Sequence, residues 1–360
     1  MHTLSIGPYN IGSDHPPFIV AEISANHRHS LQTALSLLEA AKAAGAHAVK
    51  LQTYTPDTIT LPLNTGAFIV QDPGSPWNGR QLYDLYKEAY TPWDWHAALF
   101  EKCRSLDLLC FSTPFDSTAV DFLEQLNVPC YKIASLEAVD LPLIRKVAST
   151  KKPLLLSTGA CTLGEIAEAV ACAKAAGCTQ LLLMKCPLAY PAPTTIAHLR
   201  TLPHLQASFN VPVGFSDHTA GIGAAIASIA FGSCVIEKHF TISRQEGGVD
   251  ASFSLEPPEL RLLVEESLRA WQALGSIQYG PTPTELPCLS LRRSLYFVKD
   301  MSAGSTVSAD ALKSLRPGEG LSPIHYEQII GLTLRQDVSY GQAVQWEHFI
   351  SPSRTPNQKF

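Results

Sequence analysis

The chain has 360 residues, of which 46% are hydrophobic and 16% are charged, and its formal net charge is −5. A chain of this length exceeds the size at which a single core keeps growing, so we expect one large domain with a small one, or two comparable domains. The hydrophobic content excludes a disordered chain. The mildly acidic charge excludes the basic field that nucleic-acid binding requires, so a bound anion must be held by individual lysines and arginines.

The chain contains nine cysteines, without any CxxC spacing. We interpret them as reduced packing residues of a cytoplasmic protein. The N-terminal residues lack the basic region and apolar stretch of a signal peptide, and no run of about 18 apolar residues occurs. The sequence therefore predicts neither secretion nor membrane insertion.

Short apolar segments alternate with stretches of helical period from residue 18 to about residue 275. This alternation is typical of repeated strand–helix units and a parallel sheet. Eight strand segments predict a closed (β/α)8 TIM barrel, with helices such as 30–44, capped by Ser30, and 163–176, stopped by Gly177, in an outer ring. The predicted strands are residues 18–24, 46–53, 108–113, 129–135, 153–158, 180–186, 212–216 and 234–239.

Two further segments define the predicted domain organisation. Residues 54–90 contain four prolines and are too long for an ordinary strand–helix loop, so we expect them to fold over the barrel mouth. The proline-rich stretch 279–289 predicts a linker between a barrel domain, 1–278, and a small domain, 290–352, followed by a tail, 353–360. The small domain has β-like pieces at 294–298 and 343–349 and would be marginally stable alone.

Polar residues at the C-terminal ends of the strands are the candidates for chemistry, because a TIM barrel places its working groups there. Lys50 and Gln52 are two residues apart and so face the same side of their strand. A lysine inside an apolar strand is costly unless it meets an anion. Lys132 and Lys185 repeat the arrangement, and three such lysines favour a phosphate and carboxylate pocket over the alternative of three ion pairs with neighbouring glutamates.

Hydroxyls and carboxylates lie at the same predicted mouth. Ser135 and Ser157 could hold the phosphate, or serve only as turn and cap residues. Glu22 and Glu137 stand where a general acid or base is wanted, and structural salt bridges are the alternative.

Two histidines are the candidates for a metal site. His218 and His239 end the neighbouring seventh and eighth strands, which places their imidazoles close together. Two neutral imidazoles with open remaining positions suit a catalytic divalent ion, and a hydrogen-bonded pair of core histidines is the alternative. Asp250, in the loop after the eighth strand, could hold a metal-bound water.

Seven segments resemble motifs of the sialic acid synthase family, in order. They are residues 21–27 (AEISANH), 50–53 (KLQT), 112–115 (STPF), 131–135 (YKIAS), 156–159 (LSTG), 216–219 (SDHT) and 237–241 (EKHFT). The resemblance covers essentially the whole chain, since residues 293–331 resemble the antifreeze-like (SAF) domain of these enzymes. It implies an enzyme that condenses phosphoenolpyruvate with an amino-sugar aldehyde and uses a divalent metal ion, manganese, magnesium or cobalt.

The resemblance also implies roles for individual residues. It places the metal on His218 and His239 and the partner of the metal-bound water on Asp250. Glu22 and Glu137 match active-site carboxylates of the family. The residues that match substrate contacts are Lys50, Gln52, Thr113, Lys132, Ser135, Ser157 and Tyr190. Arg316, in the small domain, matches an arginine that reaches the sugar in the partner subunit's barrel, which implies a domain-swapped homodimer.

Within the family, residues 248–257 and 82–93 are more similar to pseudaminic acid synthases than to the N-acetylneuraminate branch. This similarity implies condensation of phosphoenolpyruvate with 2,4-diacetamido-2,4,6-trideoxy-L-altrose and water, giving pseudaminic acid and phosphate by C–O cleavage. Leu188 stands where the neuraminate branch has asparagine, and Val249 replaces a usual proline. The alternatives are an N-acetylneuraminate or legionaminate synthase and, from another class, a catalytically inactive sugar-binding barrel.

Overall fold

The computed structural model describes residues 3–75 and 77–350. The chain divides into two compact units, Met1–Gly275 and Ser276–Phe360. None of the helices in the described residues is long and apolar enough to cross a membrane.

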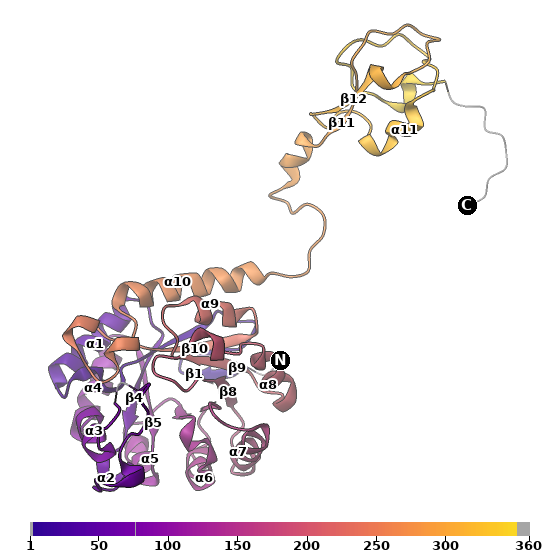
Figure 1. The fold of residues 1–360 in the computed structure, drawn as a ribbon. Coiled ribbons are helices and arrows are strands. Elements are labelled where there is room, and N and C mark those ends of the chain that lie inside the picture. The colour runs from indigo at the N-terminus through magenta and orange to yellow at the C-terminus, as the bar shows by residue number, and fades with distance from the viewer. Residues whose placement is uncertain (1–2, 76, 351–360) are drawn as a thin grey trace. The chain divides into compact units, whose positions relative to one another are not determined.

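The first unit is a closed barrel of eight parallel strands, as predicted (Figure 1). Each predicted strand segment overlaps one of them, and consecutive strands are neighbours around the ring, which β10 closes by pairing with both β9 and β3. The strands are β3 Phe18–Glu22, β4 Ala48–Thr53, β5 Leu109–Pro114, β6 Tyr131–Ile133, β7 Leu154–Ser157, β8 Leu181–Lys185, β9 Val213–Asp217 and β10 Ser233–His239.

Helices surround the barrel, and the first of them begins with the predicted cap (Figure 1). Ser30 caps the first by accepting a hydrogen bond from the Thr33 backbone N–H at 3.3 Å. Thr162 and Glu165 form a reciprocal capping box at the start of α7. The helices are α1 Leu31–Ala43, α4 His96–Ser105, α5 Ser117–Gln125, α6 Leu141–Ser149, α7 Leu163–Ala175, α8 Thr201–Phe209, α9 Gly223–Ile229 and α10 Pro257–Leu274.

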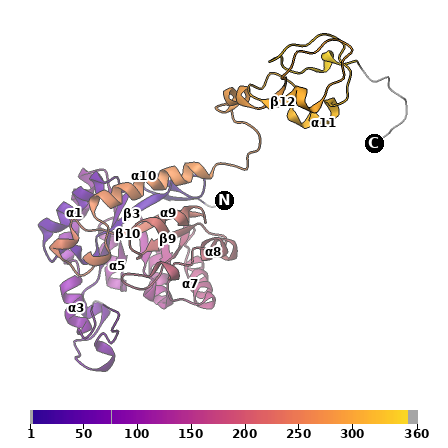
Figure 2. The same cartoon turned by 45° about the horizontal axis from the view of Figure 1, so that its top comes forward.

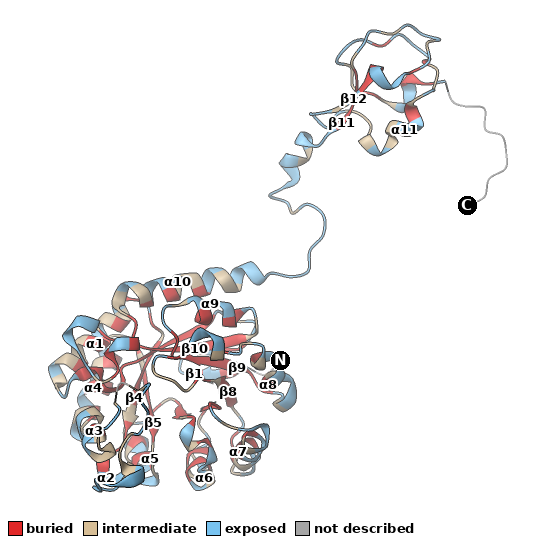
Figure 3. Ribbon diagram, in the orientation of Figure 1, coloured by how far each residue is buried: buried red, intermediate tan, exposed pale blue. Residues whose placement is uncertain are grey.

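The two faces of each strand are buried in different environments (Figure 3). In β4, Val49 and Leu51 pack in the core between barrel and helices, whereas Ala48 belongs to the cluster inside the barrel. Because side chains alternate along a strand, Lys50 and Gln52 also point inward.

An N-terminal hairpin, which was not among the predicted strands, pairs β1 Leu4–Ile6 with β2 Tyr9–Ile11. Its apolar side chains pack with Phe18 and Leu182 in the cluster inside the barrel. These partners lie at the starts of strands, so the hairpin closes the N-terminal end. The opposite end, where the strands finish, remains as the mouth.

The segment predicted to fold over the mouth contains α2 Pro56–Ile59, η2 Gly66–Phe68 and α3 Leu82–Ala89, and it is followed by η3 Trp93–Trp95. Figure 2 shows α3 and the chain before it extending from the barrel. Trp77 reaches the loop after β10, where its indole N–H donates to the Val249 carbonyl at 3.4 Å. The segment therefore contacts the mouth.

The second unit contains the antiparallel pair β11 Ser294–Phe297 and β12 Leu312–Leu315, with a small core that includes Phe297, Leu334 and Val344. The predicted β-piece 294–298 is confirmed. The predicted β-piece 343–349 is confirmed only at its ends, where Ala343 forms a β-bridge with Tyr296 and Phe349 forms one with Leu334. Between them lies the 3-10 turn η11 Trp346–His348, in which His348 accepts a hydrogen bond from the Gln345 backbone N–H at 3.1 Å.

The domain boundaries remain predictions. The proposed linker 279–289 includes the start of η8 Leu286–Leu291, and the proposed tail 353–360, with residues 351–352, lies outside the described residues.

Candidate active site

A buried ion pair joins the first two barrel strands at the mouth. Strand register places Glu22 of β3 opposite Lys50 of β4, and their side chains form an ion pair. The other Glu22 oxygen accepts a hydrogen bond from the Ser24 backbone N–H at 2.9 Å and lies 3.4 Å from the Gln52 amide nitrogen. Thr113 of β5 lies beside the lysine, with 3.2 Å between its hydroxyl oxygen and Lys50 Nζ. The structure thus brings together four of the predicted site residues.

Glu237 connects this pair to the second inward lysine. Its Oε1 lies 3.7 Å from Lys50 Nζ and 3.6 Å from Lys132 Nζ, and accepts a hydrogen bond from Ser216 at 3.0 Å. Its Oε2 is buried without a hydrogen-bond partner. The sequence placed Glu237 at a strand end but assigned it no role.

The third predicted lysine does not belong to this group. Along β8, Leu182 and Met184 belong to the cluster inside the barrel and Leu183 to the core around it. Lys185 therefore points outward, and its Nζ lies 3.5 Å from the Cys186 carbonyl oxygen. The prediction that three lysines line one pocket is wrong for Lys185.

The predicted phosphate-binding hydroxyls come from the strand that carries Lys132 and from the next strand in the barrel: Ser135 comes after β6, and Ser157 ends β7. Ser135 accepts a hydrogen bond from the Gly159 backbone N–H at 3.0 Å, and the buried Ser157 hydroxyl has no hydrogen-bond partner. A Cβ at Gly159 would lie 2.8 Å from Ser135 Oγ and 2.6 Å from the Cys186 carbonyl oxygen, so a side chain here would displace the residues around it. An unpartnered buried hydroxyl is well placed to bind a ligand oxygen.

The two predicted metal-binding imidazoles are neighbours, with ring centroids 5.2 Å apart. His218 Nδ1–H donates to the Pro187 carbonyl at 2.9 Å, which leaves Nε2 as the nitrogen with a free lone pair. His239 Nδ1 is buried without a hydrogen-bond partner and lies 3.7 Å from Asp250 Oδ2. Two available imidazole nitrogens beside a carboxylate fit a divalent metal ion.

Within residues 3–75 and 77–350, no three His, Cys, Asp or Glu side chains are grouped as ligands of one ion. A metal held by this histidine pair would therefore keep positions for water or substrate.

Aromatic rings border the imidazoles. The ring of Tyr190 lies 4.4 Å from that of His218 and 5.3 Å from that of Phe253. The ring of Trp77, from the segment 54–90, lies 5.7 Å from that of Tyr190. We call Trp77, Tyr190 and Phe253 the aromatic wall.

Cys186 was predicted to be a packing residue, but it lies at the site. Its sulfur is 3.9 Å from His218 Nδ1. Burial acts to raise the pKa of this thiol, but His218 and Lys132 outweigh burial and lower it to about 7. The absence of CxxC spacing argued against a metal or redox site made of two cysteines. It could not show that Cys186 lies next to His218, which is 32 residues away in the sequence.

Residues 37–279 match the NeuB family, and residues 292–350 match the SAF domain. The chain belongs to the NeuB family. It is 42% identical to the pseudaminic acid synthase of Helicobacter pylori over 317 residues, 88% of this chain and 93% of that protein. It is 37% identical to the N,N'-diacetyllegionaminic acid synthase of Legionella pneumophila, over 94% of this chain and 96% of that protein.

A solved structure of this family, the N-acetylneuraminic acid (sialic acid) synthetase of Leptospira borgpetersenii, superposes with a TM-score of 0.72 at 29% identity, over 80% of this chain and 95% of that chain. The family is one of synthases, and this chain is an enzyme of that type.

Two remaining predicted residues of this NeuB family member lie apart from the ion pairs. Glu137 lies on the 3-10 turn η4 Leu136–Val139 after β6, and burial raises the pKa of its carboxyl group against the opposing effect of Lys132. Arg316 is exposed in the second unit, directly after β12. The structure therefore leaves its predicted contact with the sugar of a partner barrel as a prediction.

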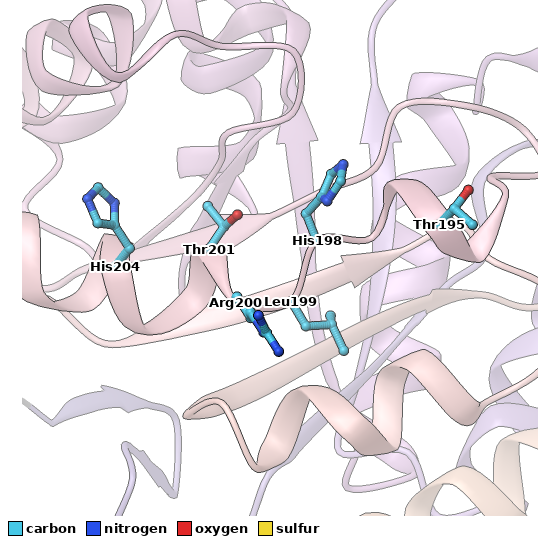
Figure 4. A pocket seen from close by; sticks show the side chains of 6 residues that line it. All are labelled: Thr195, His198, Leu199, Arg200, Thr201 and His204. Carbon is cyan, nitrogen blue, oxygen red and sulfur yellow. The ribbon is translucent and has the colours of Figure 1, made fainter.

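A surface hollow of about 680 Å³ lies at the start of α8 (Figure 4). None of the predicted site residues lines it. Its lining residues are Thr195, His198, Leu199, Arg200, Thr201 and His204. It is very open and lacks the buried charged groups described above, so it is not the candidate site.

Two buried histidines behind the mouth predict a loss of stability in acid. Burial lowers the pKa of both His27 and His96 from 6.5 to about 4. The unfolded chain therefore binds protons between pH 6.5 and pH 4 that the folded chain does not, and each histidine reduces the unfolding free energy by about 2 kcal/mol between pH 7.5 and pH 5.

His96→Gln should remove its share of this pH dependence, because glutamine does not titrate. Urea unfolding at pH 7.5 and pH 5 measures the difference, with the exposed His204→Gln as control. Equal pH dependence in all three proteins would contradict the prediction.

Proposed function

We propose that this NeuB family enzyme condenses phosphoenolpyruvate with 2,4-diacetamido-2,4,6-trideoxy-L-altrose and water to give pseudaminic acid and phosphate. The observation that carries the proposal is the buried pair of lysines, Lys50 and Lys132, held by Glu237 beside the two imidazoles. An inactive sugar-binding barrel has no need of four buried charged groups at its mouth, because each is costly to bury.

Lys50 and Lys132 would hold the anionic groups of phosphoenolpyruvate. Both are almost fully buried, so their attraction to an anion is screened little by water. Glu237 Oε1 lies 3.7 Å from Lys50 Nζ and 3.6 Å from Lys132 Nζ, so both ammonium groups are ion-paired with the same carboxylate oxygen. The hydroxyls of Thr113, Ser135 and Ser157 would complete the cradle.

The histidine pair would bind a divalent metal ion, which when bound supplies a Lewis acid for the open-chain sugar aldehyde. The residues of the chain orient this aldehyde. Asp250 accepts a hydrogen bond from Ser24, which in turn accepts from the Gln52 amide at 3.1 Å, so these polar groups link the sugar end to the phosphoenolpyruvate end.

In the proposed reaction, C3 of phosphoenolpyruvate forms a bond to the aldehyde carbon, and water adds to C2. The C2–O bond to phosphate then breaks, which leaves a ketone at C2. Burial raises the pKa of Glu22 to about 6 against the opposing effect of Lys50, so this carboxyl group exchanges a proton near neutral pH. Glu22 and Glu137 are the groups that would accept the water proton and return one to the new alkoxide.

The choice of sugar rests on similarity and on the character of the pocket. The chain is 42% identical to the Helicobacter pylori pseudaminic acid synthase. Leu188 lies against Gly159, where the position of a Cβ would be 2.8 Å from its Cγ. An apolar leucine and the aromatic wall favour a deoxy sugar with acetyl groups over a more hydroxylated one. A legionaminate synthase is the second candidate, because the Legionella pneumophila enzyme is 37% identical.

Phosphate release from phosphoenolpyruvate tests the proposal, with the altrose derivative, the legionaminate precursor and N-acetylmannosamine assayed side by side. We expect the highest kcat/KM for the altrose derivative. With 18O in the bridging oxygen of phosphoenolpyruvate, C–O cleavage puts the label into phosphate. Label in the keto acid would contradict the mechanism, and a preference for another sugar would contradict the substrate.

We also propose that the enzyme works as a homodimer in the cytoplasm. The nine unpaired cysteines are consistent with a reducing compartment. The exposed Arg316 is available to a second copy of the chain, and Arg316→Ala with measurement of the KM for the sugar tests that contact.

A further inference from the structure

Trp77 takes no part in the bond-forming and proton-transfer steps proposed above, and it contacts two loops of the barrel mouth. Its indole N–H donates to the Val249 carbonyl at 3.4 Å, in the loop that carries Asp250. Its ring centroid lies 5.7 Å from that of Tyr190 with an interplanar angle of 47°. These contacts hold a half-buried aromatic side chain from a long insertion next to the candidate sugar site.

The rings continue from Trp77 to the candidate metal site. Tyr190 lies between Trp77 and His218, whose ring centroid is 4.4 Å from that of Tyr190. Phe253 packs against both Tyr190, at 5.3 Å, and His239, at 5.0 Å. A sugar whose aldehyde carbon lies at the two imidazoles therefore has the aromatic wall along one side.

The aromatic wall is uncharged, and the indole N–H of Trp77 already has a hydrogen-bond partner in the protein. The Trp77 N–H is directed to Val249, so the indole presents its ring to the sugar rather than a donor. Aromatic faces favour C–H groups over hydroxyls, because a hydroxyl placed there loses its hydrogen bonds to water.

We propose that Trp77 is a specificity-determining residue: its indole closes the sugar site as an apolar wall that favours a methyl group at the sixth carbon of the sugar over a hydroxymethyl group. The proposal deepens the proposed function and rests on it. An apolar site that distinguishes a methyl group from its hydroxylated counterpart contributes a factor of about 10 to 200.

The test compares two sugars that differ only at the sixth carbon: 2,4-diacetamido-2,4,6-trideoxy-L-altrose and its counterpart with a hydroxyl on that carbon. We expect Trp77→Ala to lower kcat/KM for the trideoxy sugar by about 10- to 100-fold and to lower the preference between the two sugars by about 10-fold. Trp77→Phe keeps an aromatic face and should retain most of the preference. The KM for phosphoenolpyruvate should stay within about 2-fold, because the lysine pocket is untouched.

Trp93 provides the matched control. It lies after the same insertion and donates its indole N–H to the Tyr54 carbonyl at 3.1 Å, but its ring stacks on Phe122, 4.7 Å away. Trp93→Phe should leave the sugar preference unchanged. If Trp77→Ala also leaves the sugar preference unchanged, or lowers kcat/KM for both sugars by the same factor, Trp77 only supports the fold and the proposal is overturned.

Binding measurements separate this proposal from the reaction itself. Calorimetric titration gives the ratio of Kd values for the two sugars without turnover. A wild-type ratio of about 10 or more that falls in Trp77→Ala supports the wall even if no product forms, which would contradict the proposed function alone. A ratio near one in the wild-type protein overturns the wall.

Discussion

Replacing Lys132 with methionine is expected to lower kcat/KM for phosphoenolpyruvate by at least about 30-fold. The variant removes a cation that faces the anion and leaves Glu237 with one fewer partner, and truncating one member of a buried charge pair costs about 2 to 5 kcal/mol. Steady-state assays of phosphate release measure the loss. Urea unfolding measures how much of it reflects the stability of the fold.

Lys185→Met is the matched control. Lys185 also ends a barrel strand, but it points away from the lysine pocket and is half-buried. Its substitution should leave kcat/KM for phosphoenolpyruvate within about 3-fold, since its ammonium group is directed to the Cys186 carbonyl and not to the lysine pocket. A large and equal loss in both variants would contradict the assignment of Lys132 to the substrate.

The double variant Lys132→Met with Glu237→Gln separates the two roles of Lys132. If the lysine serves only to neutralise Glu237, removing both charges restores activity as well as stability. If it holds phosphoenolpyruvate, the double variant regains stability and remains inactive. We expect the second result.

The barrel could be predicted from sequence because its eight strands are short apolar segments that alternate with stretches of helical period. The hairpin of β1 and β2 could not, because each strand has only three residues and its stability comes from packing into the barrel. Residues 343–349 were predicted as β-like, but only their two ends form β-bridges, because His348 closes a turn between them.

Whether polar and apolar residues alternate along a strand explains which site residues could be predicted. In β4, polar Lys50 and Gln52 alternate with apolar Val49 and Leu51, so the sequence itself shows which residues share a face. Residues 181–184 of β8 are all apolar, because both faces of this strand are buried, and nothing in them shows that Lys185 points outward.

Glu237 shows what sequence leaves undetermined. Its neighbour Lys238 is also buried in β10, and only the register shows that Lys238 pairs with Asp217, at 3.1 Å, on the outer side of the strand. Glu237 then faces inward to the two lysines. Three-dimensional pairing, not residue type, distinguishes the site carboxylate from a structural ion pair.

Removal of divalent metal is expected to lower kcat by about 1,000-fold or more. In such reactions a Lewis acid and an activated oxygen each lower the activation free energy by several kcal/mol. Dialysis against a chelator followed by addition of manganese, magnesium or cobalt measures both the loss and its recovery. Activity that survives complete chelation would contradict a metal at the histidine pair.

Substitution of the histidines tests where the metal binds. His239→Gln should lose both activity and the metal-dependent rise in melting temperature. The buried Nδ1 of His239 has no hydrogen-bond partner in the protein, so we expect this nitrogen to bind the metal ion. In the wild-type protein, metal at 100 times its Kd should add about 2.7 kcal/mol to the unfolding free energy. The exposed His204→Gln should keep both properties.

The alternative of a structural histidine pair makes a different prediction. His218 directs its N–H to the Pro187 carbonyl, and the two imidazole rings meet edge to face rather than through a shared hydrogen bond. If the rings serve only as core residues, His239→Gln changes stability equally with and without metal. A metal effect that disappears in this variant but persists in His204→Gln assigns the ion to the mouth of the barrel, next to the lysine pocket.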